Sequence, residues 1–426
     1  MALSSQAYKG TRDFYPEEMS VRRQVFEKFR EIARKFGFSE YDGPLLESYD
    51  LYAAKSGEEL VSQQLYSFED RGNRKVAIRP EMTPTLARMV AAKLGELQPP
   101  LKWFSIPNLY RYERPQKGRL REHWQLNVDI LGGDAELADS EILEFAAGVF
   151  DSFGCGDKIR IRVNHRAWVN YYMKDVLGLD AEKSLKLSKI LDAKEKTTEE
   201  VFTSGVLEIL EEGDMAKPKA SLLKEYIDTP LVEMHKKYPN SPIAELSKVL
   251  ETLGRPELFE YDPIIMRGLD YYTGIVFEGF DRSGSNRRAI FGGGRYDNLI
   301  ALFGKQELSG IGFGMGDVVL MDFLSENQLL PKNQPKCDFF VSLPSNDFWK
   351  DASAFAKVLR DRNFSVQMSL KSGNFKQQLK AADRSGASFS LLFGEDEWKE
   401  SKVILRNMKT SSQEVLSLEE ISKKVF

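Results

Sequence analysis

The chain has 426 residues, of which 42% are hydrophobic and 29% charged, and its formal net charge is -4. This length predicts two or three domains, and this composition is typical of a globular protein and excludes a disordered one. No apolar run approaches the roughly 18 residues of a membrane span, and the opening MALSSQAYKGTRDF lacks a hydrophobic signal core, so we expect a cytoplasmic protein with no membrane segment.

Hydrophobic periodicity predicts the first elements of the chain. A helix over 16–36 begins with a proline, which suits a first helical position, and carries apolar residues at helical spacing. An extended segment over 41–46 follows, and QQLYSFEDRGNRKVAIRP then predicts a β-hairpin that turns at 71–73. Thr83 and Pro84 are typical of an N-cap and a first helical position, so a second helix is expected to begin there.

The centre of the chain changes character. Strands are expected on both sides of a basic stretch, and a helix over 135–153 follows. Residues 171–254 are rich in Lys, Glu and Leu with helical periodicity, which indicates a helical insertion. Strand character resumes over 264–280 and passes through two glycine-rich runs, FGGGRYDNL and GIGFGMGDVVL. Over 331–426, strands and helices alternate, which predicts a small α/β domain.

The basic stretch RYERPQKGRLREH, from Arg111 to His123, gathers five Lys and Arg residues in an acidic chain. The loop, which turns at Gly118, offers Arg114, Lys117, Arg119 and Arg121. Guanidinium groups stay charged and bind phosphate oxygens in pairs, so these arginines suit a polyphosphate. An exposed hairpin loop without a ligand would carry the same charges, so the stretch alone leaves both interpretations open.

A row of polar residues follows the basic stretch. In WQLNVDI the side chains of Gln125, Asn127 and Asp129 share one face of the predicted strand, because side chains alternate along a strand. Buried polar atoms need partners, so such a face is costly as a packing surface. A polar ligand explains this row, which a solvated loop does not explain, and the two stretches together favour a ligand site.

A second candidate site is RGLDYYTGIVFE, from Arg267 to Glu278. Gly268 lets the backbone approach a ligand closely, and of the adjacent Tyr271 and Tyr272 one can enter a pocket while the other packs. A packed aromatic pair is the alternative. The run FGGGRYDNL lacks the Lys-Ser/Thr of a P-loop and the GxGxxG order of a dinucleotide fold, which argues against both of those nucleotide sites.

Cysteine and histidine are too sparse for two other kinds of site. Cys155 and Cys337 form no CxxC or Cys/His spacing, so no metal site is predicted. Only three histidines occur, which disfavours a Ser/His/Asp hydrolase.

In this order, the motifs resemble those of the class II aminoacyl-tRNA synthetases and, within them, the histidyl-tRNA synthetases. KGTRDFYPEE resembles the family's N-terminal signature, and GFSEYDGPLLES is similar to its motif 1, whose proline, here Pro44, lies at the dimer interface. RPEMT and RYERPQKGRLREHWQLNVD resemble the substrate loop and motif 2, while RGLDYYTGIVFE and GGGRYD resemble two stretches peculiar to the histidine enzymes. GNFKQQLKAADRSGASFSLLFGEDE resembles the anticodon-binding domain, so the resemblance covers nearly the whole chain.

This resemblance implies an α+β fold. A class II catalytic core with an antiparallel sheet and flanking helices would occupy 1–330, with the helical insertion at about 171–254, and an α/β anticodon-binding domain would occupy 331–426. The implied reaction is the ATP-dependent ligation of L-histidine to histidine tRNA through a histidyl-adenylate. The implied enzyme is a homodimer, and Mg²⁺ would bridge the phosphate oxygens of ATP.

Site residues follow from the same resemblance. Arg111 would hold the α-phosphate of ATP, and Arg267 would stabilise the charge that develops there as the histidine carboxylate attacks. With Gln125 they form the implied catalytic set. ATP would contact Arg111, Glu113, Arg119 and Arg121. Histidine would contact Glu81, Met82, Thr83, Arg111, Gln125, Asp129, Arg267, Tyr271, Tyr272 and Tyr296, with Asp129 and two of the tyrosines reading its imidazole.

Two positions depart from the family's pattern. The family usually has Glu where this chain has Asp129, which is shorter by a methylene group, so either the strand lies closer to the ligand or a water intervenes. Motif 3 normally ends in Gly-x-Glu-Arg with the arginine over the adenine, and Val319 of GMGDVVL stands at the arginine position. An apolar Val319 can still pack against the base, so we expect the basic loop and Arg267 to carry more of the ATP binding than in relatives.

Two other functions fit parts of the sequence. A catalytically silent regulatory subunit of histidine biosynthesis resembles the core, but generally lacks the anticodon-binding domain and tends to lose residues such as Arg111, Gln125 and Arg267. A nucleic-acid-binding accessory factor on the same fold would carry a basic surface without the RGLDYY pocket. The ligase accounts for all the motifs and is favoured.

Overall fold

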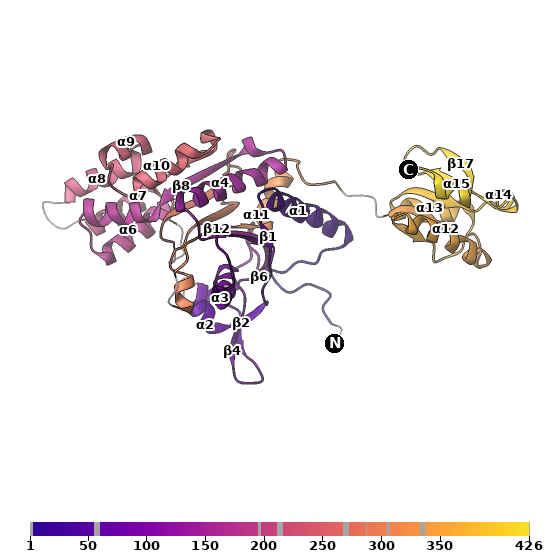
Figure 1. Cartoon of the computed structure of the whole chain (residues 1–426), viewed down its shortest axis with the longest axis horizontal. Coiled ribbons are helices and arrows are strands. Elements are labelled where there is room, and N and C mark those ends of the chain that lie inside the picture. The colour runs from indigo at the N-terminus through magenta and orange to yellow at the C-terminus, as the bar shows by residue number, and fades with distance from the viewer. Residues whose placement is uncertain are drawn as a thin grey trace. The chain divides into compact units, whose positions relative to one another are not determined.

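The computed structural model of the chain describes residues 3–54, 60–194, 197–210, 216–266, 272–286, 288–304, 307–332 and 337–425. The chain divides into two compact units, Met1–Pro331 and Lys332–Phe426 (Figure 1). Within the described residues, none of the helices combines the length and the apolar character that crossing a membrane requires.

A nine-stranded sheet forms the centre of the first unit, in the order β1-β5-β7-β12-β11-β10-β8-β9, and β6 pairs with β7. Its neighbours are antiparallel except at the pairs β1·β5 and β8·β9. The antiparallel core expected from the sequence is therefore confirmed. The strands are β1 (Ser39–Glu40), β5 (Leu101–Ser105), β6 (Asn108–Tyr110), β7 (Glu122–Leu131), β8 (Ile159–His165), β9 (Phe259–Tyr261), β10 (Ile275–Asp281), β11 (Phe291–Arg295) and β12 (Gly310–Gly316).

Helices α1 (Pro16–Lys35), α4 (Ala135–Ser152) and α11 (Asp317–Glu326) pack on one face of this sheet (Figure 1). Leu126, Val128 and Ile130 of β7 point into the core beneath them. Each large apolar side chain buried in this way contributes about 1.5–3 kcal/mol. The polar residues that alternate with them on β7 therefore face the other side of the sheet.

The predicted N-terminal elements are present, with small differences. α1 begins at Pro16 as expected, but residues 41–45 lie outside any strand. The predicted hairpin is β3 (Ser67–Glu69) and β4 (Lys75–Ile78), which join β2 (Leu46–Ser48) in a small sheet near α2 (Tyr49–Ala53). α3 (Thr83–Lys93) has Met82 as its N-cap, so Thr83 is its first residue rather than the cap, a shift of one position.

The helical insertion packs against the edge of the main sheet. Its aromatic core contains Trp168, Tyr172 and Tyr226, all fully buried. The Trp168 indole donates a hydrogen bond to the Tyr261 hydroxyl of β9 at 3.0 Å, which ties the insertion to the sheet. The helices are α5 (Arg166–Tyr171), α6 (Ala181–Ala193), α7 (Glu199–Leu210), α8 (Ala216–Asp228), α9 (Leu231–Lys237) and α10 (Ile243–Thr252).

The strand predicted over 264–280 is shorter in the structure, where the described strand is β10. The segment was expected to be extended from Ile264 onward, but Ile264, Ile265 and Met266 lie outside any strand. Residues 267–271, which include the predicted site residues Arg267 and Tyr271, lie outside the described part of the chain.

The second unit has a five-stranded sheet in the order β14-β13-β15-β16-β17. The alternation of strands and helices predicted there is present through β15, and the last two strands form an antiparallel extension that the sequence did not reveal. The elements are β13 (Cys337–Val341), α12 (Trp349–Asp361), β14 (Val366–Met368), α13 (Phe375–Ser385), β15 (Ala387–Leu392), α14 (Glu395–Lys399), β16 (Lys402–Asn407), β17 (Gln413–Ser417) and α15 (Leu418–Lys423).

Candidate functional site

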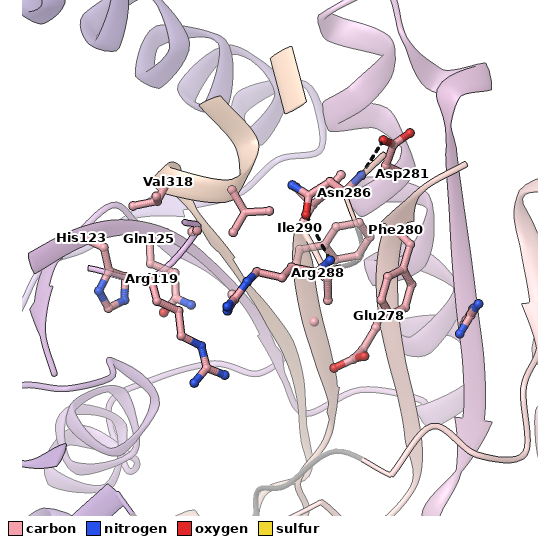
Figure 2. Close-up of a pocket in the computed structure, with 18 of the residues that line it drawn as sticks. Arg119, His123, Gln125, Glu278, Phe280, Asp281, Asn286, Arg288, Ile290 and Val318 are labelled. Carbon is pink, nitrogen blue, oxygen red and sulfur yellow. Dashed lines mark hydrogen bonds between the residues drawn. The ribbon is translucent and has the colours of Figure 1, made fainter. Parts of the chain in front are cut away.

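A cavity of about 1020 Å³ opens on the face of the main sheet opposite to α1 and α4 (Figure 2). Its walls come from the basic loop 111–121, from strands β7, β10, β11 and β12, and from the start of α11. Charged and polar side chains on these walls include Arg111, Glu113, Arg119, His123, Gln125, Arg160, Arg162, Glu278 and Arg288. The cavity therefore suits a polar ligand that carries negative charge.

The basic loop is a tight turn held by its own backbone. The Gln116 and Arg119 backbones hydrogen-bond each other in both directions, at 3.0 and 2.9 Å, and Gly118 adopts a φ of 75°. Arg119 is 53% exposed, and its Nε lies 3.5 Å from Glu113 Oε2. The Glu113 side chain is only 12% exposed, but the Arg119 side chain extends into solvent and is held by this one long contact, so its guanidinium stays available to a ligand.

Arg111 connects the cavity to the segment before α3. Its Nε donates a hydrogen bond to the Pro80 carbonyl at 2.9 Å. The neighbouring Arg79 is buried and fixes the same segment through Asp42, at 3.0 Å, and the Gly43 carbonyl, at 2.7 Å. The segment that carries the predicted residues Glu81, Met82 and Thr83 is thereby held next to Arg111.

Three glycines of strand β12, Gly312, Gly314 and Gly316, lie beside the polar row of β7 and form the glycine floor of the site. Gly312 pairs with Asp129 and Gly316 with Gln125 across the two strands. A Cβ atom on Gly312 would lie 2.1 Å from Asp129 Oδ1, and one on Gly314 would lie 2.4 Å from Gln125 Nε2. Glycine is therefore required at both positions if the side chains of β7 are to lie across β12.

Asp129 lies in a buried pocket further along β7. It is 3% exposed, and the Tyr296 hydroxyl donates a hydrogen bond to its Oδ1 at 2.5 Å. Burial raises the pKa of Asp129 to about 7, although the Tyr296 hydrogen bond opposes the shift. Among the described residues, Asp129 Oδ2 is buried without a hydrogen bond, and the buried Tyr41 hydroxyl and Ser105 Oγ have only a poorly formed contact with each other.

These unsatisfied atoms indicate a ligand. Leaving a buried polar atom unpaired costs about 1–3 kcal/mol, so a pocket with several of them is stabilised by a molecule that offers hydrogen bonds. Tyr41 stacks at a tilt on Trp103, the cross-strand partner of Asp129, with 5.8 Å between ring centroids. The Tyr272 ring lies over Gly294, where an added Cβ would meet it at 2.8 Å, and contributes to the same apolar cluster as Tyr296.

The residues predicted from the sequence fall into three groups. Arg111, Glu113, Arg119 and Gln125 line the cavity. Glu81 and Met82 are buried, Thr83 is half-buried, and all three stand where α3 begins, whereas Asp129, Tyr272 and Tyr296 belong to the buried end of the site. The third group is Arg267 and Tyr271, which lie outside the described residues.

Arg121 differs from the other predicted ATP contacts, because it does not line the cavity. Its Nε donates to the Glu113 carbonyl at 3.1 Å, and its Nη1 donates to the Tyr8 hydroxyl at 3.0 Å. The guanidinium lies 4.0 Å from the ring centroid of Tyr112. These contacts hold the loop against the N-terminal segment, so in this geometry Arg121 stabilises the loop rather than facing the cavity.

Three contributions were not found from the sequence. His123 lines the cavity, and burial together with Arg111 lowers the pKa of His123 to about 3, so it is neutral there. Asp317 accepts hydrogen bonds from Arg12, at 2.7 Å, and from the Trp124 backbone, at 3.0 Å, which joins the KGTRDF segment to β7 and α11. Arg288 reaches the cavity from the loop before FGGGRYD, where its basic neighbourhood was the available signal.

Comparison with known proteins agrees with this geometry. A family model for histidyl-tRNA synthetase matches residues 10–316, and one for an anticodon binding domain matches residues 338–425. A histidine–tRNA ligase of Leptospira biflexa is 43% identical over 426 residues, which cover 99% of this chain and 98% of the relative. The chloroplastic/mitochondrial histidine–tRNA ligase of Arabidopsis thaliana is 36% identical over 416 residues, which cover 97% of this chain and 85% of the relative.

The fold has a solved counterpart as well. The crystal structure of histidyl-tRNA synthetase from Nostoc sp. PCC 7120 superposes with a TM-score of 0.81 at 20% identity, over 100% of both chains. At that identity the likeness concerns the fold, whereas the family model and the full-length relatives concern the family. On these grounds, the chain belongs to the histidyl-tRNA synthetase family.

Proposed function

We propose that this enzyme ligates L-histidine to histidine tRNA, using ATP to form a histidyl-adenylate first. The observation that carries the proposal is the polar row of β7, which has Gln125 in the cationic cavity and Asp129 in the buried pocket. The two residues are four positions apart, about 13 Å along a strand. A single extended ligand, an amino acid joined to a nucleotide phosphate, would reach both the cavity at Gln125 and the buried pocket at Asp129.

The cavity is the proposed ATP site. Arg111 would contact the α-phosphate, and Arg119 the outer phosphates, since guanidinium groups bind phosphate oxygens in pairs. Mg²⁺ would arrive with ATP and offset phosphate charge, and the carboxylates Glu113 and Glu278 on the cavity wall are ligands of the kind that it takes. Arg267 keeps its predicted role of stabilising the charge that develops at the α-phosphate.

The buried pocket is the proposed histidine site. Asp129 and Tyr296 would hydrogen-bond the imidazole, whose two ring nitrogens suit the unsatisfied atoms there. Gln125 and the Glu81–Thr83 segment would hold the carboxylate and ammonium groups. A site built from buried polar atoms rejects analogues that lack matching hydrogen-bond groups, because those atoms would remain unpaired.

The second unit would bind the anticodon of the tRNA, as its family model suggests, and the reaction would take place in the cytoplasm.

We also propose a homodimer. Leu45 and Leu46, next to Pro44 of the motif 1 segment, are 45% and 44% exposed, which is typical of a surface that a partner covers. Light scattering should give twice the mass of one chain, and a monomer at micromolar concentration would contradict the dimer.

The deciding experiment is histidine-dependent ATP–pyrophosphate exchange, followed by charging of histidine tRNA. The proposal requires exchange that depends on histidine and transfer of histidine to the tRNA. Absence of exchange at saturating histidine would contradict it and favour the regulatory-subunit alternative. That alternative is already disfavoured by full-length relatives named as ligases and by the anticodon-binding match over residues 338–425.

A further inference from the structure

Arg288 stands in the loop between β10 and β11, which side-chain hydrogen bonds hold in shape. The Asp281 carboxylate, buried at the end of β10, accepts from the Ser283 backbone at 2.9 Å and from the Asn286 backbone at 3.3 Å. The Asn286 side chain in turn accepts from the Arg288 backbone at 3.1 Å (Figure 2). The position of Arg288 on the cavity wall is therefore set by Asp281 rather than left to a free loop.

The Arg288 side chain reaches toward the basic loop, close to Val319. A Cβ on Gly118 would lie 2.9 Å from Arg288 Cδ and 3.4 Å from Val319 Cγ2, so the three residues meet at one point. The aliphatic part of Arg288 therefore fills space that a longer side chain at position 319 would need. Figure 2 shows the guanidinium directed into the cavity from the β10–β11 side, and Arg119 directed into it from the basic loop.

Arg288 differs from two other cavity arginines in its lack of a direct acidic partner among the described residues. Arg119 has Glu113 at 3.5 Å, and Arg162 has Asp262 at 3.2 Å. In the part of the chain that the structure describes, the Arg288 guanidinium makes no hydrogen bond or ion pair, although the residue is only partly exposed. Two guanidinium groups that face one space repel each other unless an anion lies between them, so the arrangement favours a ligand with several anionic oxygens.

We propose that Arg288 binds the triphosphate of ATP, together with Arg119 from the facing wall. In this chain the arginine of the β10–β11 loop would thereby supply the cation that Val319 does not. The proposal rests on the proposed function for the identity of the ligand. It adds a nucleotide-binding residue outside the motifs of the family.

The test is the ATP dependence of the exchange reaction in Arg288→Ala. Loss of charge-assisted hydrogen bonds worth about 1.5–3 kcal/mol should raise the KM for ATP about 10- to 100-fold, while the KM for histidine stays within about twofold. The KM for ATP of Arg288→Lys should lie between those of the wild type and Arg288→Ala, because lysine keeps the charge but lacks the paired N–H donors of a guanidinium group. Arg282→Ala is the matched control: it lies on the same loop, but its guanidinium donates to the Glu257 carbonyl at 2.7 Å, outside the cavity.

A second measurement separates the phosphates from the base. Inhibition of exchange by adenosine, which has no phosphate, should be unchanged in Arg288→Ala. An ATP KM within twofold of the wild type, or an equal loss of affinity for ATP and adenosine, would overturn the proposal. A wild-type protein without exchange would instead contradict the proposed function, and calorimetric titration of ATP into the wild type and Arg288→Ala would still decide whether Arg288 binds it.

Discussion

The two ends of strand β7 form sites of opposite character on one face of one sheet. At the Gln125 end, the cavity is wide and its cations are in part exposed to water, as the 53% exposure of Arg119 shows. At the Asp129 end, the carboxylate is 3% exposed and has an oxygen without a partner. Under the proposed function, this difference divides the work of the site: charge would hold the large anion, and burial would select the small polar group.

Physical magnitudes support this division. A solvent-exposed ion pair contributes about 0–1 kcal/mol, so the open end can bind a charged ligand only by using several cations together. A buried polar atom left unpaired costs about 1–3 kcal/mol, so at the closed end a single hydrogen bond is enough to discriminate between ligands that form it and ligands that do not. Variants at the two ends should therefore change different kinetic constants.

Arg111→Ala should have the largest effect. Arg111 lines the cavity and is fixed by Pro80, so its removal takes away a preplaced cation at the position proposed for the α-phosphate. We expect kcat/KM for ATP–pyrophosphate exchange to fall about 100- to 1000-fold. Lys117→Ala is the control on the same loop, since Lys117 pairs with Glu326 at 3.0 Å away from the cavity. Comparable losses for both variants would mean that the loop acts through its total charge.

Asp129→Asn should affect the closed end alone. The substitution keeps the shape of the side chain but weakens its acceptor toward an imidazole N–H, which predicts a rise of about 10- to 100-fold in the KM for histidine. The KM for ATP should stay within about twofold. Steady-state exchange with each substrate varied in turn measures both constants, and a parallel rise in both would show that the two ends are not separate.

Stability should also depend on pH through Asp129. The folded chain keeps the proton of Asp129 up to about pH 7, whereas the unfolded chain releases it near the ordinary carboxyl pKa of 3.8. The folded state therefore binds more protons in this window, and the free energy of unfolding contributed by Asp129 falls as the pH rises from about 4 to 7. Urea unfolding across this range should show a smaller decline in the free energy of unfolding for Asp129→Asn than for the wild type. Equal pH dependence of the two proteins would mean that another group titrates.

Arg121→Ala should have the smallest effect on the reaction. Its contacts with Tyr8, Tyr112 and the Glu113 carbonyl predict a loss of about 1–2 kcal/mol of stability, with the KM for ATP within about twofold. Thermal unfolding and exchange kinetics test the two parts, with the exposed Arg114→Ala as the control for stability. A tenfold rise in the KM for ATP would instead restore the direct phosphate contact that the sequence predicted.

The sequence predicted the parts of the molecule that depend on local periodicity. The alternation of Gln125, Asn127 and Asp129 with apolar residues fixed which face of β7 is polar, because that face follows from the two-residue period of a strand. The start of α1 at Pro16 was equally local. The cavity residues Arg111 and Arg119 were identified because their motif is contiguous with that strand.

Contacts between distant segments could not be obtained in the same way. Arg121 was expected at the phosphates, but its guanidinium meets Tyr8, which is 113 residues earlier in the chain. Tyr41 lies beside the Asp129 pocket only because its segment follows a strand that pairs with β5. Arg288 belongs to no motif, and its relation to Val319 follows from how two loops fold onto one cavity. Such contacts are tertiary, and no local pattern encodes them.

The glycine floor of β12 limits how the specificity of this enzyme can be redesigned. Side chains introduced at Gly312 or Gly314 would overlap the groups of β7, so mutation there can only subtract volume from the pocket. The floor already has the smallest residue that the genetic code offers. Accepting an amino acid larger than histidine would therefore require shortening a wall residue such as Tyr296, whose hydroxyl contacts Asp129.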